Sequence, residues 1–184
     1  MSFCNDWFLG ASRLGRGLVF TSGIANTHNY PKPKWQICWH KPAATSFNRL
    51  GGYNAWEPIL VYGDVRGRIG QDYIQINTLN LKKGPEKDHP CPKPKALMTW
   101  LVRGLSKEGD TIADIFCGAG TTLVACKELN RHGIGIEINE KYCEIAKKRL
   151  RATCKPLFRD EPKPRKEDAE LWTKQSEAQG RDGV

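Results

Sequence analysis

The sequence predicts an α/β fold in which strands and helices alternate around a sheet that is at least partly parallel. Two observations predict it. Residues 95–152 follow the order helix, strand, helix, strand, helix with short connections, which is the pattern of a parallel strand–helix–strand unit. Residues 16–76 instead contain short runs rich in aromatic and β-branched residues, separated by glycine and proline, as strands joined by loops are.

The first half of the chain is expected to supply three strands and a shorter fourth one. They are RGLVFTSG (16–23), WQICWHK (35–41), WEPILVYG (56–63) and the shorter DYIQI (72–76). Trp35, Trp39 and Trp56 belong to these runs, and we expect them to be core and strand-packing residues rather than residues that stack on nucleic-acid bases. Residues 77–94 are polar and rich in proline.

The second half begins with an amphipathic helix. Its apolar residues Leu97, Trp100, Leu101 and Leu105 recur at helical spacing, and Gly109 is expected to end it. A buried strand (111–116), a helix (121–132), a second buried strand (133–138) and a helix to about Ala152 follow. The tail, residues 153–184, has few apolar residues and scattered prolines, so we expect it to be disordered.

Composition limits the class of protein. The chain has 184 residues, enough for one domain, and its longest apolar runs are far shorter than the roughly 20 residues that span a bilayer. The seven cysteines lack the paired spacing of a zinc site, so we expect no metal and no disulfide framework. Its first residues do not form a signal peptide, which predicts a cytoplasmic protein.

The positive charge is concentrated before the tail. Residues 155–184 carry seven basic and seven acidic side chains, so the net charge of +9 arises from 22 basic and 13 acidic residues in 1–154. A basic folded region suits a polyanion such as nucleic acid, although solubility alone would explain it equally well.

A glycine-rich stretch, DIFCGAGTT (114–122), carries the chemistry. Gly118 and Gly120 permit backbone angles and a close ligand approach that side chains would block. Thr121 and Thr122 are expected to cap the following helix, whose N-terminus offers free N–H groups. Glu137 follows Gly118 by nineteen residues, at the end of the next strand, where a carboxylate can accept hydrogen bonds from ribose hydroxyls.

Three nucleotide-like ligands compete for this stretch. A dinucleotide fingerprint requires a third glycine, but Leu123 stands in its place. A phosphate-binding P-loop requires a lysine before Ser or Thr, and this turn has none. S-adenosylmethionine needs a glycine turn and an acidic residue that binds its ribose, but no pyrophosphate-binding site, so it fits this stretch best.

Four segments then resemble bacterial and phage DNA amino-methyltransferases. DIFCGAGTT, RHGIGIE (131–137) and YCEIAKKRL (142–150) resemble the patterns D-x-F-x-G-S-G-T-T, G-R-x-x-I-G-I-E and Y-x-x-x-A-x-x-R-L, and HPCPKP (89–94) resembles H-P-x-x-K-P. The last precedes the glycine motif in the permuted class of that family. The resemblance implies a Rossmann-like S-adenosylmethionine-dependent fold and methylation of the exocyclic amine of adenine or cytosine in DNA.

The resemblance also implies a function for each part of the chain. Residues 1–63 would be strands of the catalytic half, 64–88 a variable segment that recognises the DNA target, and 89–152 the cofactor half. The implied cofactor-binding residues are Asp114, Phe116, Cys117, Gly118, Ala119, Gly120, Thr121, Thr122, Glu137, His89, Lys93 and Pro94. Arg66, Arg68, Lys82 and Lys83 are the implied DNA contacts.

One element of that family is not in this sequence. Its catalytic loop, Asp/Asn/Ser-Pro-Pro-aromatic, requires adjacent prolines, and none of the eleven prolines here are adjacent. The strand that carries the loop would lie between the strands at 111–116 and 16–23. We therefore expect an incomplete sheet, no catalytic residue in this chain, and a missing N-terminal segment or complementing chain as partner.

Three alternatives remain open at this point. Pro90-Cys91 and DIFCGAG resemble parts of cytosine carbon-5 methyltransferases, but in the reverse order. Without the catalytic loop, the chain could be a non-catalytic fragment or subunit that binds S-adenosylmethionine and DNA. Methylation of RNA or protein with the same cofactor fold is the third.

Overall fold

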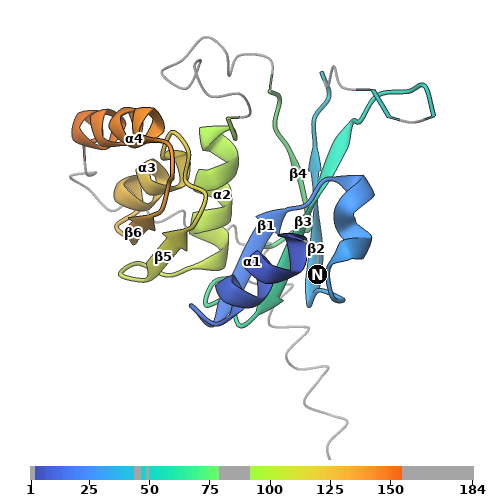
Figure 1. Ribbon diagram of the computed structural model, residues 1–184, viewed down its shortest axis with the longest axis horizontal. Helices are drawn as coiled ribbons and strands as arrows, with labels where there is room; N and C mark the ends of the chain where they lie inside the picture. The colour runs from blue at the N-terminus through green and yellow to red at the C-terminus, as the bar shows by residue number, and fades with distance from the viewer. Residues whose placement is uncertain (1–2, 44–46, 49, 79–91, 155–184) are drawn as a thin grey trace, which may run out of the picture.

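The computed structural model describes residues 3–43, 47–48, 50–78 and 92–154. The expectations for Lys82, Lys83, His89, Cys91 and the tail from residue 155 therefore lie outside the described residues. Figure 1 shows the described chain as two groups of elements, one built around a four-stranded sheet and one around a two-stranded sheet.

The first group contains all four strands predicted for the first half. Their order is β1-β3-β2-β4, with β3 antiparallel to both neighbours and β4 parallel to β2. A helix and a short 3-10 helix, which the sequence did not predict, flank β1. The elements are α1 (Phe3–Ser12), β1 (Gly17–Thr21), η1 (Ile24–Asn29), β2 (Trp35–His40), β3 (Trp56–Gly63) and β4 (Tyr73–Gln75).

The second group confirms the predicted order of helices and strands, and β5 and β6 are parallel. The elements are α2 (Lys95–Leu105), β5 (Thr111–Asp114), α3 (Thr121–Glu128), β6 (His132–Gly135) and α4 (Glu140–Ala152). Within the described ranges, no helix is long and apolar enough to cross a membrane.

Two predicted helix ends were wrong. Helix α2 ends at Leu105 rather than near Gly109, because Ser106 is extended, with φ −136° and ψ 167°, and its carbonyl accepts from Arg131 Nη2 at 2.9 Å. Helix α3 ends at Glu128 rather than at residue 132, and Asn130 takes a left-handed φ of 57° that a continuing helix excludes. Both ends depend on backbone and tertiary contacts that helical periodicity does not report.

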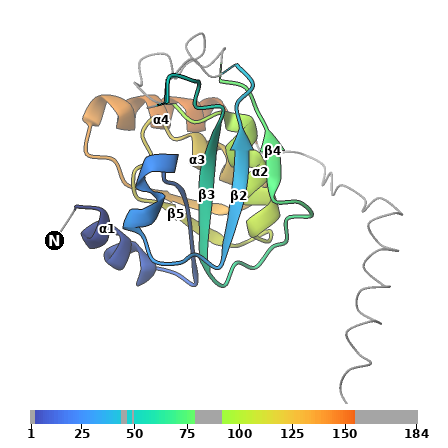
Figure 2. The same ribbon diagram turned by 90° about the vertical axis from the view of Figure 1, so that its right-hand side faces the viewer.

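Helix α2 joins the two groups by burying two of its faces. Leu97 and Leu101 pack into the core of the four-stranded sheet, which contains Ile37, Trp39, Ile59 and Val61. Val102 packs against α3, at Ala125 and Cys126. Figures 1 and 2 show α2 between the sheet and α3, so its packing links the two groups.

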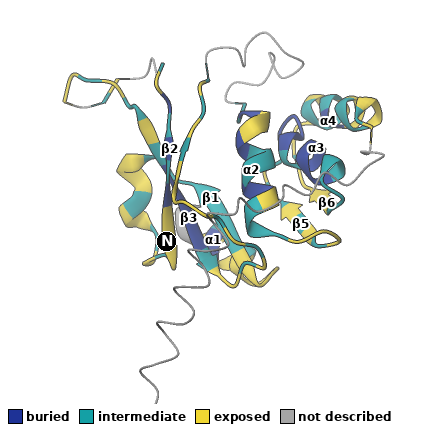
Figure 3. Cartoon of the chain, turned by 180° about the vertical axis from the view of Figure 1, so that it is seen from behind, coloured by how far each residue is buried: buried dark blue, intermediate teal, exposed yellow. Residues whose placement is uncertain are grey.

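The two sheets are not joined to each other. Among the described strands, β1 and β5 each pair on one side only, so both present an unpaired edge. The strands β5 and β6 were expected to be buried, and this was wrong: every residue of β6 is exposed, as Figure 3 shows. Helix α3 covers one face of this small sheet, but Ile134 and Ile136 on β6 and just beyond it remain exposed.

The tryptophans also depart in part from expectation. Trp39 is buried in the core, as predicted, with 1% of its surface exposed. Trp35 and Trp56 are 60% and 40% exposed, so their assignment to the core was wrong. Trp56 pairs with His40 and lies on the opposite face of the sheet from Trp39, while Trp35 stands at the first residue of its strand.

The packing of α2 predicts a large effect of one substitution. Leu97 is fully buried, so Leu97→Ala leaves a cavity between the sheet and α2 and should lower the free energy of unfolding by about 2–5 kcal/mol. Urea unfolding followed by circular dichroism measures it. Leu50→Ala, at a residue that is 95% exposed, is the control and should leave stability nearly unchanged; equal effects of the two would contradict this role of α2.

Candidate functional site

The glycine turn, residues 114–122, connects the carboxyl end of β5 to α3. Asp114 ends β5, and its Oδ1 accepts a hydrogen bond from the Phe116 N–H at 3.1 Å. Gly118 and Gly120 have φ values of 50° and 76°, which residues with side chains rarely adopt. The Gly120 N–H donates to the Cys117 carbonyl at 2.7 Å and closes the turn.

Glu137 lies directly beside this turn. Its Oε2 accepts a hydrogen bond from the Gly118 N–H at 2.9 Å, and its Oε1 accepts one from the Asn139 N–H at 2.9 Å. A carboxylate has about four lone-pair sites, so two backbone bonds leave acceptor capacity for hydroxyl groups. Asn139 in turn caps α4 by accepting from the Lys141 N–H. The acid is therefore held in place by the backbone and can still accept further hydrogen bonds.

The prediction of threonine caps on α3 was wrong. Gly120 is the N-cap residue, and no side-chain hydrogen bond caps the helix. Thr121 is buried, and its Oγ1 is 3.1 Å from Arg149 Nη1, which also donates to the Ala119 carbonyl at 2.6 Å. Helix α4 therefore contacts the side of the turn where the threonine cap was expected.

Phe116 and Cys117 differ in their surroundings. Phe116 is 60% exposed, and its ring meets the ring of Trp7 from α1 at 5.8 Å between centroids. Cys117 is half-buried, and burial, followed by the charges of Asp114 and Glu137, raises the pKa of its thiol to about 11. Cys117 is therefore a neutral thiol at pH 7, whereas a nucleophilic cysteine needs a lowered pKa.

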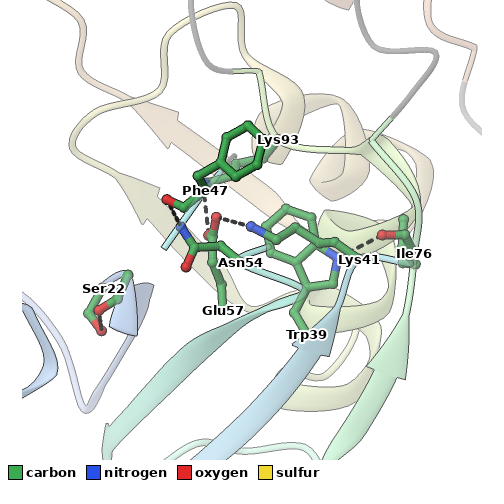
Figure 4. Close-up of polar contacts among 9 residues, drawn as sticks. Ser22, Trp39, Lys41, Phe47, Asn54, Glu57, Ile76 and Lys93 are labelled. Carbon is green, nitrogen blue, oxygen red and sulfur yellow. Dashed lines mark hydrogen bonds and ion pairs between the residues drawn. The ribbon is translucent and has the colours of Figure 1, made fainter. Parts of the chain in front are cut away.

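Lys93 and Pro94 lie at the start of α2, next to a charged cluster on the four-stranded sheet. Figure 4 shows Glu57 between two lysines: Lys41 Nζ is 2.5 Å from Oε1, and Lys93 Nζ is 3.4 Å from Oε2. Both ammonium groups lie over the ring of Trp39, at 5.3 and 5.4 Å from its centroid. This Glu57 cluster (Lys41, Glu57, Lys93 and Trp39) fixes Lys93 to the sheet.

The cluster changes the protonation of Glu57. Burial alone would raise the pKa of Glu57, but the hydrogen bonds and charges of Lys41 and Lys93 outweigh it and lower the pKa below its ordinary 4.5. Glu57 is therefore ionised at neutral pH and compensates the buried ammonium of Lys41.

Of the predicted DNA contacts, Arg66 and Arg68 lie in the described residues, and Arg66 is remote from the glycine turn. Arg66 Nη1 pairs with Asp110 Oδ1 at 2.5 Å, just before β5 begins, which is the opposite end of that strand from the turn. Arg68 lies two residues further along the same segment. Their contact with DNA stays a prediction.

Two further observations describe the surroundings of the turn. A hollow of about 470 Å³ near Arg131, His132 and Leu150 does not include the turn. No group of three His, Cys, Asp or Glu side chains that could hold a metal is found in the same ranges.

The sequence did not single out three residues that support these contacts: Lys41, Glu57 and Arg149. Arg149 is the arginine of the Y-x-x-x-A-x-x-R-L pattern, so its place in that pattern was a signal. The pairing of Glu57 with Lys93 joins residues 36 positions apart and has no local signature.

Comparison with known proteins defines the class. A family model described as DNA methylase (N6_N4_Mtase) matches residues 24–148. This match covers more than half of the chain and includes the glycine turn and Glu137. The chain belongs to this DNA methylase family.

Individual relatives agree with this assignment. The type II methyltransferase M.HpaI of Haemophilus parainfluenzae is 52% identical over 133 residues, which cover 71% of this chain and 42% of that protein. The type II methyltransferase M2.DpnII of Streptococcus pneumoniae is 42% identical over 86 residues, covering 45% of this chain and 32% of that protein. The chain thus spans less than half the length of these two relatives.

Solved structures share the fold. The M1.HpyAVI–SAM complex superimposes with a TM-score of 0.60 at 24% identity, covering 76% of this chain and 78% of that one. The PvuII DNA methyltransferase, which is cytosine-N4-specific, gives a TM-score of 0.59 at 17% identity, covering 92% and 75%. These similarities establish the methyltransferase fold.

The Glu57 cluster predicts a pH-dependent loss of stability. Because the pKa of Glu57 is lowered on folding, its contribution is complete above pH 4.5 and is lost as the pH falls through the folded-state pKa. Glu57→Gln should lower the free energy of unfolding at pH 7 by about 1–3 kcal/mol, since it leaves Lys41 without its anion. It should also reduce the further loss between pH 6 and pH 3.5, measured by urea unfolding.

The matched control is Glu144→Gln, which removes an exposed carboxylate paired with Lys147. An exposed pair of this kind contributes little, so that variant should follow the parent protein at every pH. If Glu57→Gln and the parent lost stability in parallel on acidification, Glu57 would not be the responsible group.

Proposed function

We propose that this chain is the cofactor-binding part of a DNA methyltransferase that modifies the exocyclic amine of adenine or cytosine with S-adenosylmethionine as methyl donor. The observation that carries the proposal is the contact of Glu137 with the Gly118 N–H across the glycine turn. Family membership and the names of the longer type II methyltransferases support it, and the cytoplasm of a bacterial or phage-infected cell is the expected location.

The residues at the turn fit that cofactor. Glu137 keeps lone pairs for ribose hydroxyls, and Asp114, at the end of the neighbouring strand, offers a carboxylate for a cationic amine. The exposed ring of Phe116 is available to pack against a flat base. When bound, S-adenosylmethionine would supply an electrophilic methyl group on a sulfonium; the residues of this chain would hold and orient it.

The proposal includes the permuted order of the family, with the catalytic loop supplied by a segment that is not in this sequence. The loop needs adjacent prolines, and the chain has none. The unpaired edges of β1 and β5 offer places for a strand carrying that loop. The exposed Ile134 and Ile136 would gain cover from the same segment.

Within such a completed enzyme the target base is expected to leave the DNA helix before reaction, because its amine is inaccessible in the duplex. The added loop would accept the amine protons, and this chain would fix the position of the donor. A chain that binds S-adenosylmethionine and DNA without turnover, acting as one subunit of a split enzyme, is the second candidate. The absence of the loop from the sequence favours it for the isolated chain.

The first prediction from this proposal concerns the cofactor. The chain should bind S-adenosylmethionine in titration calorimetry, and Glu137→Gln should weaken binding by roughly 10- to 150-fold, the effect of losing one charged hydrogen-bond acceptor. Glu140→Gln, an exposed acid in the first turn of α4, is the control and should bind as the parent does. Equal affinity of all three proteins would remove Glu137 from the site.

The second prediction concerns turnover. The chain alone should transfer no methyl group to DNA, whereas co-expression with a segment carrying an Asp-Pro-Pro-Tyr-like loop from a related methyltransferase should restore transfer. Radiolabelled methyl incorporation measures it, and mass spectrometry of the nucleosides distinguishes N6-methyladenine, N4-methylcytosine and 5-methylcytosine. Native mass spectrometry should find a complex; full activity of a monomer of this chain would refute the proposed completion.

A further inference from the structure

Helix α4 holds the glycine turn through Arg149. One nitrogen of its guanidinium, Nη1, donates to the Ala119 carbonyl at 2.6 Å and to Thr121 Oγ1 at 3.1 Å. These two acceptors lie on either side of Gly120, the residue at the N-cap of α3. The arginine therefore fixes the direction of the peptide between Ala119 and Gly120 from a helix about thirty residues later in the sequence.

Close packing of Gly120 against Ala146 also brings the glycine turn and α4 together. A side chain at Gly120 would place its Cβ 2.8 Å from the Ala146 Cβ, which is closer than real Cβ contacts, and 3.2 Å from the Ala146 Cα, which is tight. Ala146 is itself buried, one turn of α4 before Arg149. The turn can approach α4 this closely only because position 120 has no side chain and position 146 has a small one.

Arg149 lies in the last turn of its own helix α4, where a cation is favourable, but its guanidinium reaches the first turn of a different helix, α3. The first turn of a helix carries partial positive charge, and acidic side chains stabilise it whereas cations do not. Arg149 nevertheless places its guanidinium beside Thr121, the first residue of α3. The charge is therefore unfavourable toward α3, and the two hydrogen bonds to Ala119 and Thr121 hold the guanidinium at the turn.

We propose that Arg149 is a positioning residue for the cofactor site: it holds the Ala119–Gly120 peptide so that the Gly118 N–H stays on Glu137 and the turn keeps the shape in which it meets the methyl donor. The inference rests on the proposed function, since it deepens the role of the same turn. The proposal gives α4 a role in cofactor affinity, although Arg149 contacts the turn from the side that packs against α4.

The test uses the full chain with Arg149→Met, which keeps most of the aliphatic length and removes every donor. Arg151→Met is the matched control, because Arg151 is exposed on the same helix and its loss changes the charge equally. Affinity for S-adenosylmethionine is measured by calorimetry, and the amides of Gly118 and Gly120 are followed by hydrogen exchange in glycine-labelled protein.

We expect Arg149→Met to weaken S-adenosylmethionine binding at least tenfold and to speed exchange of the Gly118 and Gly120 amides, with the melting temperature near that of Arg151→Met. Arg149→Lys, which keeps the charge and a donor, should recover part of the affinity. Unchanged affinity or unchanged exchange in Arg149→Met would overturn the proposal.

Two further outcomes are separable. If Arg149→Met does not fold, Thr121→Val is used instead: it removes one of the two acceptors while preserving shape, and it should show the same changes to a smaller degree. If the parent chain binds no S-adenosylmethionine, the proposed function fails. The exchange of the Gly118 and Gly120 amides then still decides whether Arg149 holds the turn.

Discussion

The two-sided burial of α2 is the constraint on which the rest of the structure depends. Leu97 and Leu101 belong to the core of the four-stranded sheet, while Val102 belongs to the core under α3. Among the described residues the two sheets share no hydrogen-bonded strand pair, and the packing of α2 against both groups holds one sheet relative to the other. The Glu57 cluster adds a second link at the start of α2, where Lys93 reaches the sheet. Together these contacts set the distance between the glycine turn and the four-stranded sheet.

Local sequence patterns were sufficient to predict most elements but not their surroundings. Aromatic and β-branched runs predicted β1 to β4, and helical spacing predicted α2 and α4. The predicted ends of α2 and α3 were wrong because the extended Ser106, bonded to the distant Arg131, and the left-handed Asn130 lie where helical spacing predicted further turns. The predicted burial of β5 and β6 was wrong for a different reason. An apolar strand indicates that other elements pack on it, and among the described residues only α3 does so, on one face. Helix α1 was not predicted, because its apolar residues show only weak helical periodicity.

The candidate site was predictable where its contacts follow from a fixed spacing. Glu137 follows the glycine turn by one helix and one strand, so the fold brings it to Gly118 whatever the rest of the chain does. The contacts of Arg149 and Glu57 depend on how α4 and α2 pack, which single-sequence periodicity does not determine. A helical residue's spacing tells which face it occupies, but not which backbone carbonyl of another element it reaches.

The anchors on either side of residues 76–92 have a consequence for how this protein can change. Strand β4 is fixed to β2 before that stretch, and Lys93 is fixed to Glu57 after it. Closing a longer connection between two fixed points costs free energy that rises only with the logarithm of its length, about 0.6 kcal/mol for each doubling. Because each anchor is held by its own contacts, the register of the sheet and the start of α2 do not depend on each other through this stretch. The two ends of this stretch are therefore held independently, one by the sheet and the other by Glu57.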